Sequence, residues 1–131
     1  MSRRELREHI FRLLFRVEFH DIAQMTEQSE LYVEHLSDPT PEDVAYIQEK
    51  TAHIIEKLED LDKRVDDVAT GWKVSRMGKV DLTIIRLALF EMIYDDTIPT
   101  GVAINEAVEL AKRYGNDESP SFINGILAKL A

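Results

Sequence analysis

The stretch from Leu82 to Tyr94 constrains the fold of this chain more than any other segment, because it is apolar nearly all round. Its only clearly polar residues are Thr83, Arg86 and Glu91. A helix without a continuous polar face must be buried among other elements. Asp81, just before the stretch, is of a residue type that commonly caps a helix start. The pattern predicts a central helix surrounded by others.

The surrounding helices are indicated by apolar residues at three- and four-residue spacing and by end signals. Ser2 and Glu5 form an S-x-x-E capping box, and Thr40 followed by Pro41 is a second typical helix start. No segment alternates with period two beyond a few residues. We predict an all-α fold of about seven helices. The first helix begins at Arg3, the second spans residues 26–36, and a long helical segment over 41–71 breaks near 59–60. The central helix spans residues 82–94, the next helix ends at Gly115, and the last begins at Ser119.

Composition excludes several function classes. The absence of cysteine excludes a disulfide framework, a thiolate zinc site and a cysteine nucleophile. The start of the chain lacks a signal-peptide apolar run, and no segment approaches the ~20 apolar residues of a membrane span, so we expect a cytoplasmic protein with no membrane partner.

Motifs for catalysis are also missing. There is no E-x-x-H pair, P-loop or G-x-S-x-G elbow. The acidic residues between Glu59 and Asp67 are interspersed with basic ones and are interpreted as a solvated helix face. We therefore expect no metal, no cofactor and no enzymatic activity.

Charge is unevenly distributed along the chain. The chain carries 16 basic and 25 acidic residues, a net charge of −9, yet residues 1–16 contain five arginines against two glutamates. A basic end on an acidic body suggests a polyanion at the end and a basic protein on the body. The alternative is that the acidic surface only keeps the protein in solution.

The first candidate binding surface is the start of the first predicted helix. Arg3, Arg4 and Arg7 lie in its first two turns, where the positive end of the helix dipole adds to their charge. Guanidinium groups bind phosphate and stack on unpaired bases, which favours RNA as the ligand. The alternative is local ion pairing, as between Glu8 and Arg12.

The second candidate surface is the turn from Tyr114 to Phe122, YGNDESPSF. It combines aromatic side chains, a glycine stop, exposed acids and a new helix N-terminus, whose free N–H groups favour an anion. Its simpler interpretation is a connection between two helices.

The stretch from Ile98 to Leu130, IPTGVAINEAVELAKRYGNDESPSFINGILAKL, closely resembles the C-terminal part of the bacterial transcription antitermination factor NusB family. The motifs are VAINEAVELAK and F-[IV]-N-G-[IV]-L. The segment from Trp72 to Glu91 and the arginine-rich first helix are also similar to that family. The resemblance covers essentially the whole chain, most weakly between His20 and Pro41.

The resemblance implies a single domain over residues 1–131, built from two small helical bundles packed together. It implies binding of boxA-type single-stranded RNA from ribosomal RNA leaders, together with the ribosomal protein NusE, within an antitermination complex on RNA polymerase. Matched position by position, the RNA-binding residues are Arg3, Arg4, Arg7, Phe15, Tyr114, Glu118 and Phe122, and the helix face for the protein partner includes Asp81, Arg86 and Glu91.

The chain also departs from the family pattern. Many members have a small residue where this chain has Ile10, a glutamine where it has Arg12 and a tyrosine where it has Phe15. The phenylalanine lacks the phenol hydroxyl that could form a hydrogen bond to RNA. Arg12 adds either a phosphate contact or only an ion-pair partner for Glu8. A NusB-like domain also heads certain ribosomal RNA methyltransferases, although this sequence has no room for a catalytic domain. Two alternatives therefore remain: a detached RNA-binding domain of such an enzyme, or a protein-interaction scaffold that forms a homodimer when free.

Overall fold

The computed structural model describes residues 1–131 and contains seven α-helices, three short 3-10 helices and no strand. The predicted all-α class is therefore confirmed. The chain divides into two units, Met1–Glu56 and Lys57–Ala131, each with its own helices. None of the helices combines the length and the apolar character needed to cross a membrane.

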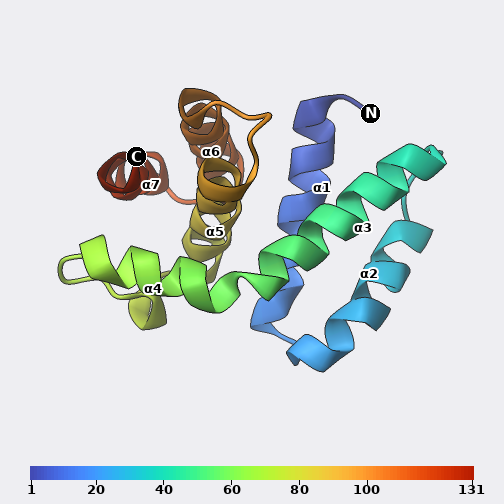
Figure 1. Ribbon diagram of the computed structural model, residues 1–131, viewed down its shortest axis with the longest axis horizontal. Helices are drawn as coiled ribbons and strands as arrows, with labels where there is room; N and C mark the ends of the chain where they lie inside the picture. The colour runs from blue at the N-terminus through green and yellow to red at the C-terminus, as the bar shows by residue number, and fades with distance from the viewer. The chain divides into compact units, whose positions relative to one another are not determined.

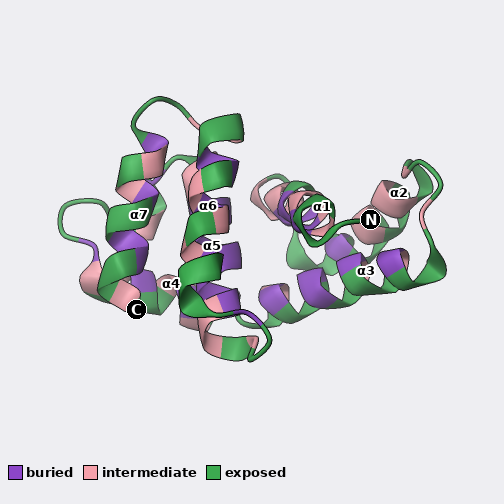
Figure 2. Ribbon diagram, turned by 90° about the horizontal axis from the view of Figure 1, so that it is seen from above, coloured by how far each residue is buried: buried purple, intermediate pink, exposed green.

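The first unit contains α1 (Arg3–Phe15), α2 (Met25–Glu34) and α3 (Pro41–Glu56). Helix α1 lies against both α2 and α3 (Figure 1). On α3, Ile47, Thr51 and Ile54 follow one another at four and three residues and are all buried, so this helix turns one face inward and the other to solvent (Figure 2). The Thr51 hydroxyl has no hydrogen-bond partner.

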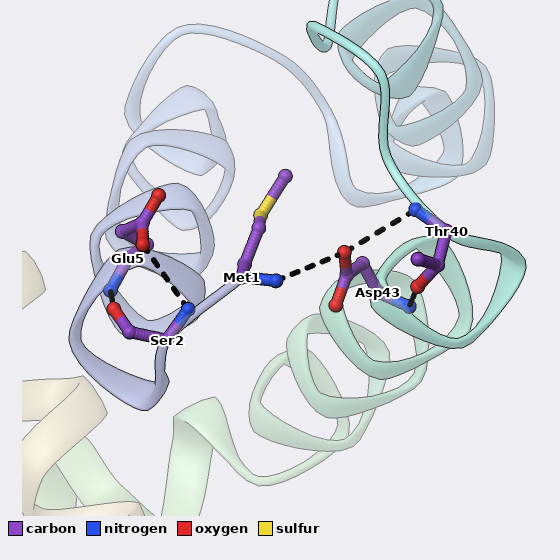
Figure 3. A network of polar contacts seen from close by, with 5 residues as sticks. All are labelled: Met1, Ser2, Glu5, Thr40 and Asp43. Carbon is purple, nitrogen blue, oxygen red and sulfur yellow. Dashed lines mark hydrogen bonds and ion pairs between the residues drawn. The ribbon is translucent and has the colours of Figure 1, made fainter.

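Two predicted helix starts in the first unit are confirmed by their hydrogen bonds (Figure 3). Ser2 Oγ accepts from Glu5 N at 3.1 Å, and Glu5 Oε1 accepts from Ser2 N at 3.1 Å. At α3, Thr40 Oγ1 accepts from Asp43 N at 3.1 Å, and Asp43 Oδ2 accepts from Thr40 N at 3.3 Å and from the Met1 ammonium at 3.4 Å. Burial would raise the pKa of Asp43, but these hydrogen bonds and the ammonium charge together hold it below its usual value.

The second unit contains α4 (Leu58–Val68), α5 (Lys79–Tyr94), α6 (Thr100–Tyr114) and α7 (Ser119–Leu130). Helix α5 contacts all three of the others. Every residue from Leu82 to Glu91 is buried, as predicted for the apolar stretch. Helix α6 ends at the predicted stop, Gly115, and α7 begins at the predicted start, Ser119.

Two helix boundaries differ from the prediction. The long helical pattern after Pro41 breaks at Lys57, where φ is −102° and ψ is 3°, rather than near residues 59–60. Helix α5 begins at Lys79 after Gly78, so Asp81 lies in the first turn instead of capping the helix. A carboxylate in the first turn still interacts favourably with the helix dipole, which is why the sequence signal resembled a cap.

Polar side chains join α4 to α5. Arg86, although buried, donates to both carboxylate oxygens of Asp62, at 2.9 Å and 2.7 Å. The Tyr94 hydroxyl donates to Asp60 Oδ2 at 2.6 Å. The acidic stretch on α4 is therefore only partly a solvated face, because two of its carboxylates hold the neighbouring helix.

Candidate nucleic-acid interface

Two exposed cations of the first unit, Arg3 and Arg4, lie at the very start of α1. The capping box fixes this turn, and Arg3 and Arg4 directly follow Ser2 with exposed side chains. Hydrogen bonds from the Ser2 N–H and hydroxyl lower the pKa of Glu5, which keeps this carboxylate ionised beside them. Two exposed guanidinium groups at the positive end of a helix dipole have the chemistry of the predicted phosphate contact.

Arg7, the third predicted RNA contact, is buried, with 8% of its surface exposed. The apolar residues Ile10, Phe11 and Leu14 lie three, four and seven positions further on, so Arg7 shares the inward face of α1 with them. A guanidinium with so little exposed surface does not suit contact with a phosphate strand in solution. The burial of Arg7 therefore argues against its direct contact with RNA and leaves the predicted contact to Arg3 and Arg4.

Arg12 and Arg16 each have a partner within the first unit. Arg12 donates to Glu8 at 2.8 Å, which is the local ion pair considered from the sequence. Arg16 donates to Gln28 Oε1 at 2.9 Å, and its guanidinium lies 5.1 Å from the centre of the Tyr32 ring. Both contacts therefore contribute to the structure of the first unit.

Three phenylalanines form a row beyond the arginines. The half-buried Phe15 has its ring centre 6.2 Å from that of Phe11 and 5.2 Å from that of Phe19. Phe11 is buried, whereas Phe19 is 58% exposed. The sequence singled out Phe15 as the aromatic residue near RNA, and the structure adds Phe19 beside it as the more accessible ring. The residue spacing alone did not distinguish the two.

The turn between α6 and α7 is closed by its own side chains. Asn116 Oδ1 accepts hydrogen bonds from the backbone N–H groups of Glu118 and Ser119, at 2.9 Å and 3.1 Å. The Ser119 hydroxyl in turn accepts from Asn116 N at 3.0 Å. The start of α7 therefore offers fewer free N–H groups to an anion than the sequence suggested, and this correction favours the interpretation as a helix connection for that part of the turn.

The remaining predicted RNA residues of the second unit surround this turn. Tyr114 is half-buried, with the Arg113 guanidinium 5.6 Å from its ring centre. Glu118 is exposed, and Phe122 is half-buried and lines a surface pocket together with Trp72. Trp72 begins one of the segments that resemble the family, but it entered no predicted site.

The residues predicted to face a protein partner differ in accessibility. Asp81 is half-exposed in the first turn of α5. Arg86 is held by Asp62, and Glu91 is only 1% exposed. Buried side chains cannot form a docking surface without rearrangement, so of the three only Asp81 remains a candidate contact. No group of three or more metal-ligating side chains lies together anywhere in the chain.

Nearly the whole chain, residues 4–131, matches the model of the NusB family. The chain belongs to the NusB family. A relative from Agathobacter rectalis, named transcription antitermination protein NusB, is 56% identical over 131 residues that cover all of both chains. A protein of the same name from Lachnoclostridium phytofermentans is 53% identical over 130 residues, which cover 99% of this chain and 98% of that one. The resemblance found from the sequence is thus confirmed.

Solved NusB structures share the fold. NusB of T. maritima, 31% identical, gives a TM-score of 0.87 and covers 100% of this chain and 91% of its own. A chain in a crystal structure of the antitermination factors NusB and NusE in complex with dsRNA gives a TM-score of 0.86 at 21% identity, covering 98% of this chain and 94% of its own. At that identity the second match shows the fold alone.

Proposed function

We propose that this member of the NusB family is a transcription antitermination factor, which binds boxA-type RNA together with NusE and joins an antitermination complex on RNA polymerase. The observation that carries the proposal is the full-length identity of 56% to a transcription antitermination protein. Such a role places the protein in the cytoplasm, where nascent transcripts are made, and requires no catalytic group.

The surface charges fit a protein with one anionic and one basic partner. The exposed Arg3 and Arg4 supply positive charge to a phosphate backbone at a helix start. The net charge of −9 attracts a basic ribosomal protein over longer range and speeds its association. We expect weak RNA binding by the protein alone and stronger binding once NusE is present, because NusE adds its own cations and neutralises part of the acidic surface.

The deciding experiment is a titration of fluorescently labelled single-stranded RNA containing a boxA element, followed by anisotropy, with and without NusE. A scrambled RNA of equal length and composition is the control. Tighter binding of the boxA RNA in the presence of NusE supports the proposal. Binding to NusE with no RNA binding under either condition would instead indicate a protein-interaction scaffold and would overturn it.

A further inference from the structure

Gly125 lies inside α7, where glycine is less favourable than alanine because it loses more backbone entropy on folding. The fold gives no reason for it. A Cβ at this position would meet no heavy atom within 4 Å, and Gly71 is the only glycine with a positive φ. A helix-interior glycine that neither packing nor backbone conformation requires is expected where another molecule approaches the backbone closely.

The open space beside Gly125 is a surface pocket of about 270 Å³. It lies between the chain that follows α4 and the outer face of α7. Trp72, on one wall, is 58% exposed, although tryptophan is highly buried on average. The full lining consists of Ala69, Thr70, Trp72, Ser121, Phe122, Gly125, Ile126 and Lys129.

The chemistry of this lining suits a base of a nucleic acid strand. Two aromatic rings line the pocket, and bases stack on such rings whatever their sequence. A cavity of about 150 Å³ holds a benzene ring, so the volume is sufficient for a base. Lys129 is the only ionisable lining residue, and no carboxylate lines the pocket although the chain carries 25 acidic residues. A basic protein segment would favour an acidic lining, whereas a phosphate favours this one.

We infer that this pocket holds one unpaired base of the bound RNA, stacked on Trp72 over the bare backbone at Gly125, with Lys129 near the adjoining phosphate. The inference rests on the proposed function, and it extends the predicted contact at Phe122 to a complete subsite. Glu118, one turn before Phe122, does not line the pocket.

Because Trp72 is the only tryptophan of the chain, its fluorescence reports directly on this pocket. Unlabelled boxA-containing RNA is titrated into the protein, alone and with NusE, while the tryptophan emission is followed. The Trp72→Ala variant supplies the background signal from NusE. Stacking of a base on the indole should quench the emission at the same RNA concentration at which anisotropy of labelled RNA reports binding.

A larger side chain at Gly125 tests whether the pocket must be empty for RNA to bind. In Gly125→Leu the new side chain fills the space, and we expect loss of quenching and RNA binding weakened by about 5- to 140-fold, the range for one lost stacking contact. Asn124→Leu, which places the same side chain on an exposed position of α7 outside the lining, should bind as the parent does. Circular dichroism verifies the helices of both variants. If Gly125→Leu fails to fold, Trp72→Ala, at an exposed position, should show the same weakening.

The possible outcomes separate the inference from the proposed function. RNA binding with unchanged tryptophan emission, or undiminished binding by Gly125→Leu, would overturn the pocket assignment and leave the proposed function intact. Quenching by NusE without RNA would show that the pocket takes a protein segment, which also overturns it. Failure of the parent protein to bind RNA with or without NusE would remove the proposed function, and the inference with it.

Discussion

Removal of the two exposed arginines at the start of α1 should change how RNA binding depends on salt. Each phosphate contact on a single strand contributes about −0.7 to the slope of log K against log salt concentration. If Arg3 and Arg4 each contact one phosphate, the double variant Arg3→Ala/Arg4→Ala should have a slope shallower by about 1.4. Over a fourfold rise in salt, the affinity of the parent protein should then fall about sevenfold more than that of the variant.

The assay is an anisotropy titration of boxA-containing RNA with NusE present, at several salt concentrations. The matched control is Lys63→Ala/Arg64→Ala, which removes two adjacent exposed cations of α4. Their partners, Asp67 and Asp60, lie one turn away, and exposed pairs of this kind contribute little stability. An unchanged slope in the α1 variant, or an equal change in the α4 control, would refute phosphate contact by the α1 start.

Arg7 supplies an internal comparison, because it lies on the same helix but is buried. We expect Arg7→Ala to lower the midpoint of urea unfolding and to leave the salt slope of RNA binding unchanged at temperatures where the variant is folded. A slope change as large as that of the exposed pair would mean that Arg7 reaches the strand.

Three further predictions concern stability. Thr51→Val should raise the free energy of unfolding by about 1 kcal/mol, because it removes a buried hydroxyl without a partner; an unchanged or lower value in urea unfolding would show that the hydroxyl is satisfied. Gly115→Ala should lower the thermal midpoint, because its Cβ would lie 2.5 Å from the Ser119 side chain, and a parental midpoint would contradict the close packing of this turn. The pKa of His9 is lowered, chiefly by burial and then by the charge of Arg12. The contribution of His9 to stability should therefore be fully present above its usual pKa of 6.5 and should decline as the pH falls through the lowered pKa. The His9→Gln variant should flatten that decline when unfolding is measured as a function of pH.

The sequence predicted helix starts well where a side chain performs the capping. Ser2 and Thr40 both form the expected hydrogen bonds. It misplaced the break after α3 because the apolar spacing continues from Ile54 through Leu58 across the non-helical Lys57, without any proline or glycine. Periodicity records which residues are buried, and a single non-helical residue between two helices leaves no mark in that pattern.

The candidate site was predictable in its elements but not in its accessibility. The positive helix start followed from residue types, and the aromatic and partner-facing positions were implied by the family resemblance. Arg7 and Arg86 were both taken as surface contacts, yet both are buried. A few polar residues on an otherwise apolar face can be either a docking site or an internal ion pair, and only the position of the partner decides. The pocket beside Gly125 was beyond sequence reasoning, because empty space around a residue has no signal in a single chain.

The ion pair between Asp62 and Arg86 should make the contact between α4 and α5 insensitive to ionic strength. Counterions weaken contacts between exposed charges. They screen this bidentate pair far less, because only 9% of the arginine side chain is accessible to solvent. Concentrated salt should therefore dissociate a nucleic acid from the protein surface while α4 and α5 remain packed together. Release of the nucleic acid would then be reversible, because the protein stays folded and can bind again when the salt concentration is lowered.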